Sequence, residues 1–98
     1  MKLNTYTIVK AAAKVSGKPM NLIRSKTRVA SVVLIRDLCY KLCKETGIVT
    51  DRDISPYFNR DRSTITHALS RVEDNLEQLE QYRIMLDDIK DELNIYVG

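Results

Sequence analysis

The segment from Lys26 to Thr46 contains no glycine or proline, and its apolar residues recur three and four positions apart. Many of them are β-branched, which would suit a strand, but a run of this length with this period predicts an α-helix. Because the apolar residues cover a wide arc, we expect a central buried helix that ends at Gly47, with Arg36, Tyr40 and Lys44 along one side. The apolar positions are Val29, Val32, Val33, Leu34, Ile35, Leu38, Cys39, Leu42 and Cys43.

The 98 residues suffice for one small domain with a compact helical core, but not for a catalytic barrel or a Rossmann unit. A composition of 44% hydrophobic and 30% charged residues is that of a folded protein. No apolar run approaches a membrane span, and the N-terminus lacks the hydrophobic region of a signal peptide. We therefore expect a single all-α domain over residues 1–98 that stays in the cytoplasm and contacts no membrane.

Further helices are predicted on both sides of the central one. Residues 5–16 read as a first helix capped by Gly17, and Pro19 opens a short turn or a single helical turn before the basic loop. After Glu73 a nearly heptad apolar stripe with intervening acids belongs either to one long helix or to two helices with a break near 77–81. Its apolar positions are Leu76, Leu79, Tyr82, Leu86, Ile89, Leu93 and Tyr96. We expect this stripe to pack on the core; dimerisation through it is the alternative.

Cys39 and Cys43 are the only cysteines and lie four positions apart on the central helix. This spacing could place both on a metal, but a tetrahedral site needs two more ligands, and the single histidine, His67, is a poor candidate. We expect reduced, buried cysteines and no metal.

A helix-turn-helix is predicted between residues 50 and 73. The first helix has a capping pattern from Thr50, but Pro56 would then lie deep inside it, so we expect a late start after Asp53 or a distorted helix. A tight turn at Asn59 and Arg60 leads into a second helix, for which Asp61 is the natural N-cap. Its core-facing residues are Ile65, Ala68, Leu69 and Val72.

The other face of this second helix is cationic and rich in hydroxyl groups. Arg60 and Arg62 oppose the positive end of the helix dipole, which suggests an anionic partner there. Short hydroxyl residues and arginine are the side chains that reach phosphates and base edges, although a solvated polar face is the alternative. The face carries Arg62, Ser63, Thr66, His67, Ser70 and Arg71.

The distribution of charge favours the same partner. Residues 1–73 hold fourteen Lys and Arg against six Asp and Glu, a net +8, whereas residues 74–98 hold two against seven, a net −5. A basic body with an acidic end is typical of a nucleic-acid binder, although solvated faces of mixed sign also explain it. Within the body, the basic loop 24–28 could place an arginine in a minor groove or be an ordinary exposed loop.

The motif from Ile54 through Phe58-Asn59-Arg60-Asp61-Arg62-Ser63-Thr64-Ile65-Thr66-His67-Ala68 resembles the signature of the C-terminal DNA-binding domain (domain IV) of the bacterial replication initiator DnaA. The basic residues Lys26, Arg28, Arg36 and Lys44 fall where that family has its basic loop and central helix. This resemblance implies an all-helical domain, related to the Trp-repressor type of helix-turn-helix, that binds double-stranded DNA.

The resemblance also implies roles for single residues. Arg28 would enter the minor groove, and Asp61, Arg62 and Ser63 would meet base edges in the major groove. The residues implied as phosphate contacts are Arg36, Lys44, Thr64 and His67. The complete set expected at the DNA interface is Lys26, Arg28, Arg36, Lys44, Arg52, Arg60, Asp61, Arg62, Ser63, Thr64, Thr66 and His67.

The sequence departs from the family pattern at several points. Arg62 stands in place of the usual histidine and favours guanine, the turn before Arg60 is one residue shorter, and Asp51 and Arg52 replace an apolar residue and a proline. No Gly-rich phosphate loop is present, so we expect no nucleotide and no other cofactor. The chain would be an excised domain or a free-standing relative, such as a phage or mobile-element protein.

We therefore predict sequence-specific binding to double-stranded DNA in replication initiation or its regulation, by a basic helical body (1–76) with an acidic C-terminal helix (77–98). The alternative is a protein-interaction module that recruits or blocks a replication or transcription partner, or forms a homodimer, through that helix. We expect no enzyme, because His67, Asp87 and Asp88 lie on solvated helical faces.

Overall fold

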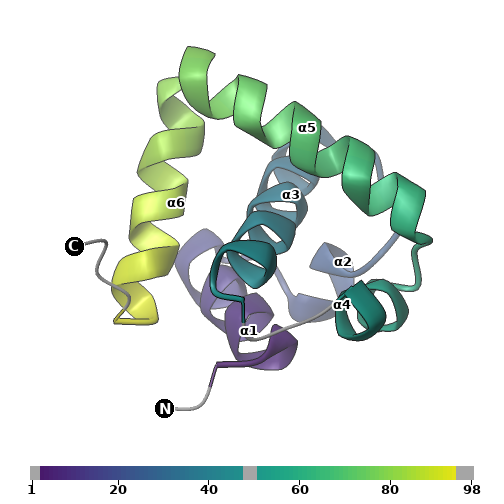
Figure 1. Ribbon diagram of the computed structural model, residues 1–98. Coiled ribbons are helices and arrows are strands. Elements are labelled where there is room, and N and C mark those ends of the chain that lie inside the picture. Colours follow the sequence, from purple (N-terminus) through teal and green to yellow (C-terminus); the bar gives the residue numbers. More distant parts are fainter. Residues whose placement is uncertain (1–2, 48–50, 95–98) are drawn as a thin grey trace.

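A computed structural model describes the backbone of residues 3–47 and 51–94 and, apart from residues 51–53, their side chains. Within these ranges the chain is helical and contains no strand, which confirms the predicted all-α class (Figure 1). The helices are α1 (Thr5–Ser16), α2 (Met20–Ile23), α3 (Ala30–Glu45), α4 (Asp51–Phe58), α5 (Arg62–Gln78) and α6 (Glu80–Glu92). No described helix has the length and apolar character that crossing a membrane would require.

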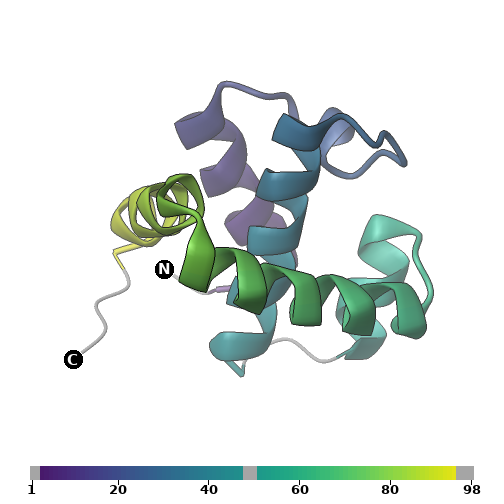
Figure 2. The ribbon, with the colours of Figure 1, turned by 90° about the horizontal axis from the view of Figure 1, so that it is seen from above.

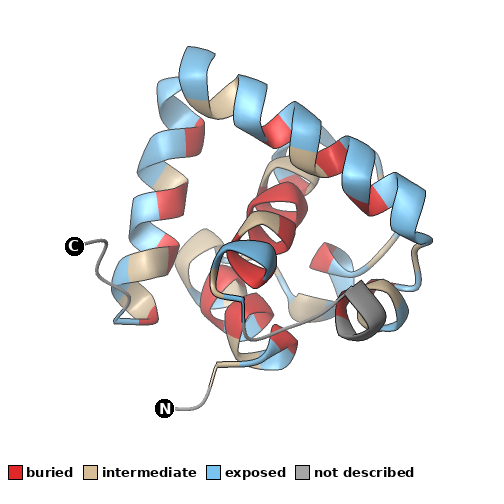
Figure 3. Ribbon diagram, in the orientation of Figure 1, coloured by how far each residue is buried: buried red, intermediate tan, exposed pale blue. Residues whose placement is uncertain are grey.

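Helix α3 is the centre of the fold, as its sequence predicted. It packs against each of the other helices, and α5 crosses it while α1 and α6 cover its other sides (Figures 1 and 2). Its inward residues are fully buried among residues of the other helices (Figure 3). Tyr40 and Phe58 meet edge to face, with ring centroids 4.7 Å apart, which joins α3 to α4.

Local signals determine where α1 begins and ends. Asn4 and Thr7 form a reciprocal capping box, in which the Asn4 Oδ1 accepts from the Thr7 N–H at 2.9 Å. Gly17 ends the helix with φ 74°, a conformation that glycine adopts without strain. The predicted first helix is thus confirmed, together with its C-terminal cap at Gly17.

The C-terminal segment forms two helices rather than one. The chain breaks at Leu79, which has extended backbone angles, and the Arg83 Nη1 donates to the Leu76 carbonyl at 2.6 Å across the break. The apolar stripe packs on the core as expected. Its buried members are Tyr82, Leu86, Ile89 and Leu93.

Two expectations from the sequence have different outcomes. Cys39 and Cys43 are buried and free, and burial raises the pKa of the Cys43 thiol to about 12. For the first helix of the helix-turn-helix, the late start is wrong, because α4 begins at Asp51 and holds Pro56 inside it. The alternative, a helix distorted by Pro56, stays a prediction.

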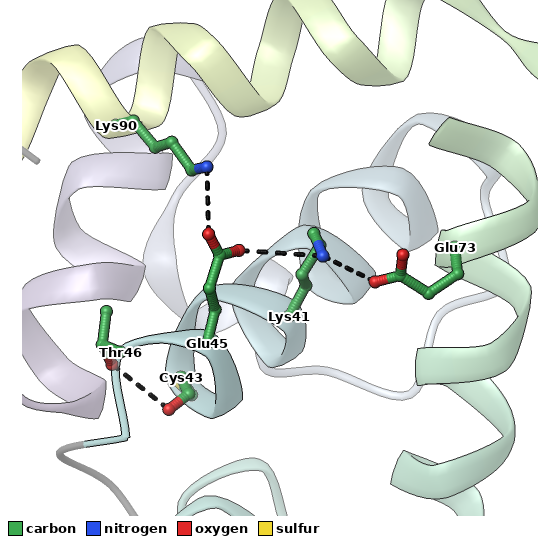
Figure 4. Close-up of polar contacts among 6 residues, drawn as sticks. All are labelled: Lys41, Cys43, Glu45, Thr46, Glu73 and Lys90. Carbon is green, nitrogen blue, oxygen red and sulfur yellow. Dashed lines mark hydrogen bonds and ion pairs between the residues drawn. The ribbon is translucent and has the colours of Figure 1, made fainter. Parts of the chain in front are cut away.

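Charged groups connect α3 to its neighbours. The Lys41 Nζ lies 2.6 Å from a Glu73 carboxylate oxygen of α5, and Glu45 lies 3.2 Å from the Lys90 Nζ of α6 (Figure 4). A longer contact of 3.7 Å joins Lys41 to Glu45. Because the carboxylates are largely exposed, each pair adds little stability, but the series links three helices.

A buried ion pair joins α3 to α5. Asp37 is 1% exposed, and its two carboxylate oxygens accept from the Arg71 Nε at 2.9 Å and the Arg71 Nη2 at 3.0 Å. Burial raises the pKa of Asp37 above its usual value, although the Arg71 guanidinium opposes that shift. The carboxylate therefore depends on Arg71 for its charged form.

We predict that Arg71→Ala destabilises the protein more than Asp37→Asn does. Removing the arginine leaves a buried carboxylate without its counter-ion, at a cost of about 3 kcal/mol, whereas Arg71, half exposed, can turn to water when Asp37 is neutral. Because the folded-state pKa of Asp37 is already raised, it should rise further in Arg71→Ala. The stability of that variant should then fall as the pH rises above the ordinary carboxyl pKa.

Urea unfolding of both variants at several pH values between 4 and 7 measures this difference. Equal losses in the two variants, or a loss in Arg71→Ala that is independent of pH, would contradict the prediction.

Candidate nucleic-acid interface

Helices α4 and α5 and the turn between them form the helix-turn-helix. Asn59 adopts φ 51°, a left-handed conformation that asparagine tolerates better than most residues. The Arg60 N–H donates to the Ser55 carbonyl at 3.0 Å, and the Ser55 hydroxyl donates to the Arg60 carbonyl. These reciprocal bonds close the tight turn that the sequence predicted and set the direction in which α5 leaves it.

Asp61 caps α5 as predicted. Its Oδ1 accepts from the Thr64 N–H at 2.8 Å and from the Ser63 hydroxyl at 2.9 Å. The backbone bond from Thr64 is the main cause that lowers the pKa of Asp61, so the carboxylate is ionised at neutral pH. The cap leaves the side chain of Asp61 exposed at the end of the helix.

The outward face of α5 is polar along its first turns, opposite the buried residues Ile65, Ala68 and Val72 (Figure 3). The Thr66 hydroxyl donates to the Arg62 carbonyl at 2.9 Å, which leaves its oxygen lone pairs available as acceptors. Arg71 also belongs to this face by sequence, but its guanidinium binds the Asp37 carboxylate on α3. The exposed residues of the face are Arg62, Ser63, Thr64, Thr66, His67 and Ser70.

Arg36 lies inside the protein instead of at its surface. It is 5% exposed, and its guanidinium donates to the Ile23 carbonyl at 2.8 Å and to the Thr27 carbonyl at 3.1 Å. This placement corrects the expectation that Arg36 is a phosphate contact. Its Nε and Nη1 donate to the backbone that precedes α3, whereas the buried Nη2 has no partner among the described residues. Burial lowers the pKa of Arg36 from the usual arginine value.

Two further arginines fasten the loop 24–29 to the helix-turn-helix. The Arg24 Nε donates to the Tyr57 carbonyl at 2.9 Å, and its guanidinium lies 4.2 Å from the centre of the Tyr57 ring. From the other side, the Arg60 Nη2 donates to the Ser25 carbonyl at 2.9 Å. The loop is therefore held by α4, by the turn and by α3 at once.

The same loop presents two cations to solvent. Lys26 and Arg28 are exposed, and neither side chain makes a hydrogen bond or an ion pair with the described residues. The loop and the N-terminal end of α5 lie on the same side of the molecule (Figure 2). Their exposed side chains form one surface, the loop–α5 face, which consists of Lys26, Arg28, Asp61, Arg62, Ser63, Thr64, Thr66, His67 and Ser70.

Two expected contacts lie apart from this face or outside the description. Lys44 is exposed near the end of α3, about 21 Å along the helix axis from Ala30, where the loop ends. The side chain of Arg52 lies outside the described residues. Sequence reasoning missed Arg24 and Asp37, and a charge inside the apolar series 29–43 was the available signal for Asp37.

Comparisons with known proteins agree with this geometry. The family described as the bacterial DnaA protein helix-turn-helix matches residues 5–72. The chromosomal replication initiator protein DnaA of Deinococcus deserti is 29% identical over 76 residues, which are 78% of this chain and 17% of that protein. The chain thus spans a small part of the length of this relative.

We predict that Asp61→Ala lowers the free energy of unfolding, because the variant leaves N–H groups at the start of α5 without a side-chain acceptor. Since folding lowers the pKa of Asp61, its contribution is present above the ordinary carboxyl pKa and is lost as the pH falls through the folded-state pKa. The deficit of the variant should therefore be constant from pH 7 to 5 and shrink below about pH 4.

Chemical unfolding measures the deficit, and Asp88→Ala, an exposed acid on α6, is the matched control. A deficit no larger than that of the control would show that the cap adds no stability.

Proposed function

Because this chain belongs to the bacterial DnaA helix-turn-helix family, we propose that it binds double-stranded DNA with sequence preference through the loop–α5 face. The observation that carries the proposal is the junction of two exposed groups of residues that are distant in the sequence. Lys26 and Arg28 come from a loop, Arg62 and Ser63 from the start of α5, and the Arg60–Ser25 bond holds them together.

The exposed side of α5 suits the major groove. The groove admits one α-helix, and the N-terminal residues of a recognition helix normally meet the base edges. In this arrangement Arg62 pairs with guanine, while Ser63 and the second carboxylate oxygen of Asp61 meet neighbouring bases. In the proposed complex Thr64 and His67 contact phosphates, and Thr66, which lies one turn after Arg62, adds to the same face.

The loop suits the adjacent minor groove. Arg28 has a long cationic side chain with no partner among the described residues, and such a groove attracts a side chain of this kind. Lys26 adds charge beside it. Arg60 contributes through the loop that it holds, and Lys44 would meet a phosphate separate from the others. We further propose a role in replication initiation or its control, by analogy with the initiator relative.

A second candidate function uses the other end of the molecule. The outer face of α6 is acidic and carries Ile84, which is 53% exposed. Because the buried stripe of α6 is occupied by the core, a protein partner would meet this outer face. Such a role predicts that Ile84→Asn leaves the affinity for DNA unchanged.

We predict that the affinity for a duplex selected from a random library falls steeply with salt. Each phosphate contact makes the slope of log K against log salt more negative by about 0.9. Arg28→Ala and Arg62→Ala should each cost about 1–3 kcal/mol on the selected duplex and much less on random duplexes, so the double variant loses its sequence preference. Fluorescence anisotropy titrations measure both quantities.

Lys10→Ala, which removes an exposed cation from α1, is the matched control. It should leave the preference for the selected duplex over random duplexes unchanged. The proposal is refuted if the unaltered protein binds no duplex at low salt, or if Lys10→Ala weakens binding as much as the two variants do.

A further inference from the structure

The loop 24–29 has few bonds of its own. Its other side-chain contacts are short-range: the Ser25 hydroxyl donates to the Leu22 carbonyl of α2 at 2.6 Å, and the Thr27 hydroxyl accepts from the Val29 N–H at 3.3 Å. No apolar residue of the loop is buried, and Val29 at its end is 57% exposed. A loop of this kind has no core to fix its position.

Bonds between the loop and the helix-turn-helix fix that position, through one arginine of the loop and one of the turn. Arg60 donates to the Ser25 carbonyl from the turn of the helix-turn-helix, and Arg24 is anchored on the Tyr57 carbonyl and ring of α4. Both arginines therefore link the loop to the elements that also set the direction of α5. Carbonyl oxygens accepting from guanidinium groups form charge-assisted bonds, which are among the stronger ones.

We propose that Arg24 and Arg60 are positioning residues that fix the Arg28 loop relative to α5, so that the protein accepts one spacing between its minor-groove and major-groove contacts. The inference rests on the proposed function. In this view the two arginines contribute to specificity without reading bases. Arg36 holds the loop against α3 in the same way, but its burial makes it unsuitable for substitution.

Geometry explains why spacing would matter. One inserted base pair moves the second contact by about 3.4 Å along the duplex and rotates it by about 35°. A loop fixed by Arg24 and Arg60 cannot follow such a shift, whereas a released loop can. Releasing the loop should therefore weaken binding to the preferred duplex and, distinctively, reduce the cost of the insertion.

The test uses the full chain with Arg24→Lys, Arg60→Lys and both together. Lysine keeps the positive charge, so attraction to phosphate is preserved, but it lacks the planar group that reaches carbonyl and ring together. Arg83→Lys is the matched control, since the Arg83 guanidinium also donates to backbone carbonyls, those of Leu76 and Glu77, at the far end of α5. Circular dichroism establishes that each variant is folded, and the single variants serve if the double variant is not.

The first measurement compares affinities for the selected duplex and for the same duplex with one base pair inserted between the two contacted segments. The insertion should cost the unaltered protein and Arg83→Lys about tenfold, and the double variant less than about threefold. An equal insertion penalty in all proteins would overturn the proposal, because a merely structural role weakens binding to both duplexes alike.

The second measurement needs no DNA. Amide hydrogen exchange at residues 25–29 should be about tenfold faster in the double variant, with α3 amides unchanged. Unchanged exchange in the loop would overturn the positioning role while leaving the proposed function intact. Faster exchange combined with no duplex binding by the unaltered protein would instead overturn the proposed function, and the inference about spacing with it.

Discussion

The arrangement of this protein depends on a helix, α3, that is buried along most of its length and contacts every other described helix. Charged side chains on such a helix are costly to bury unless the surrounding structure provides partners for them. Arg36 and Asp37 are adjacent in the sequence, and neighbours in a helix point about 100° apart. They therefore take partners on different sides of α3: Arg36 takes the loop carbonyls, and Asp37 takes Arg71 of α5. One buried turn thus positions both parts of the loop–α5 face.

The arginines serve two purposes: some bind groups within the protein, and others, such as Arg28 and Arg62, are exposed on the loop–α5 face. Arg24, Arg36, Arg60 and Arg71 donate to groups within the protein, and their bonds end on carbonyls or on Asp37. The net charge of the first 73 residues therefore overstates the number of cations available at the surface for contact with an anion. Their field still adds to the potential of the face, because an internal bond to a carbonyl leaves the charge in place.

Local signals in the sequence were sufficient for the fold and for most of the exposed face. The spacing of apolar residues three and four positions apart predicted α3, and the capping residue Asp61 predicted where α5 begins. Both signals depend only on neighbours in the chain. The burial of Arg36 was not predicted because its hydrogen-bond partners lie nine and thirteen residues away in the sequence. The ion pair of Asp37 was not predicted because its partner lies 34 residues away. The late start expected for α4 is wrong because the helix buries Ile54 and Phe58, and this packing outweighs the cost of Pro56 inside it.

The direction of α5 separates the acidic end of the chain from the basic loop–α5 face. The helix begins with Arg62 and ends among acids, and Glu77 lies about 22 Å along the axis from Arg62. This separation exceeds the screening length of about 8 Å at physiological salt, so the acids would hardly weaken contacts at the basic end. The acids would repel a polyanion that approached α6 directly. Because one end of the molecule is basic and the other acidic, the electric field of a duplex orients the protein before contact. For the proposed complex, the acids at residues 73–92 therefore act on orientation, while the arginine-held loop and the start of α5 act on recognition.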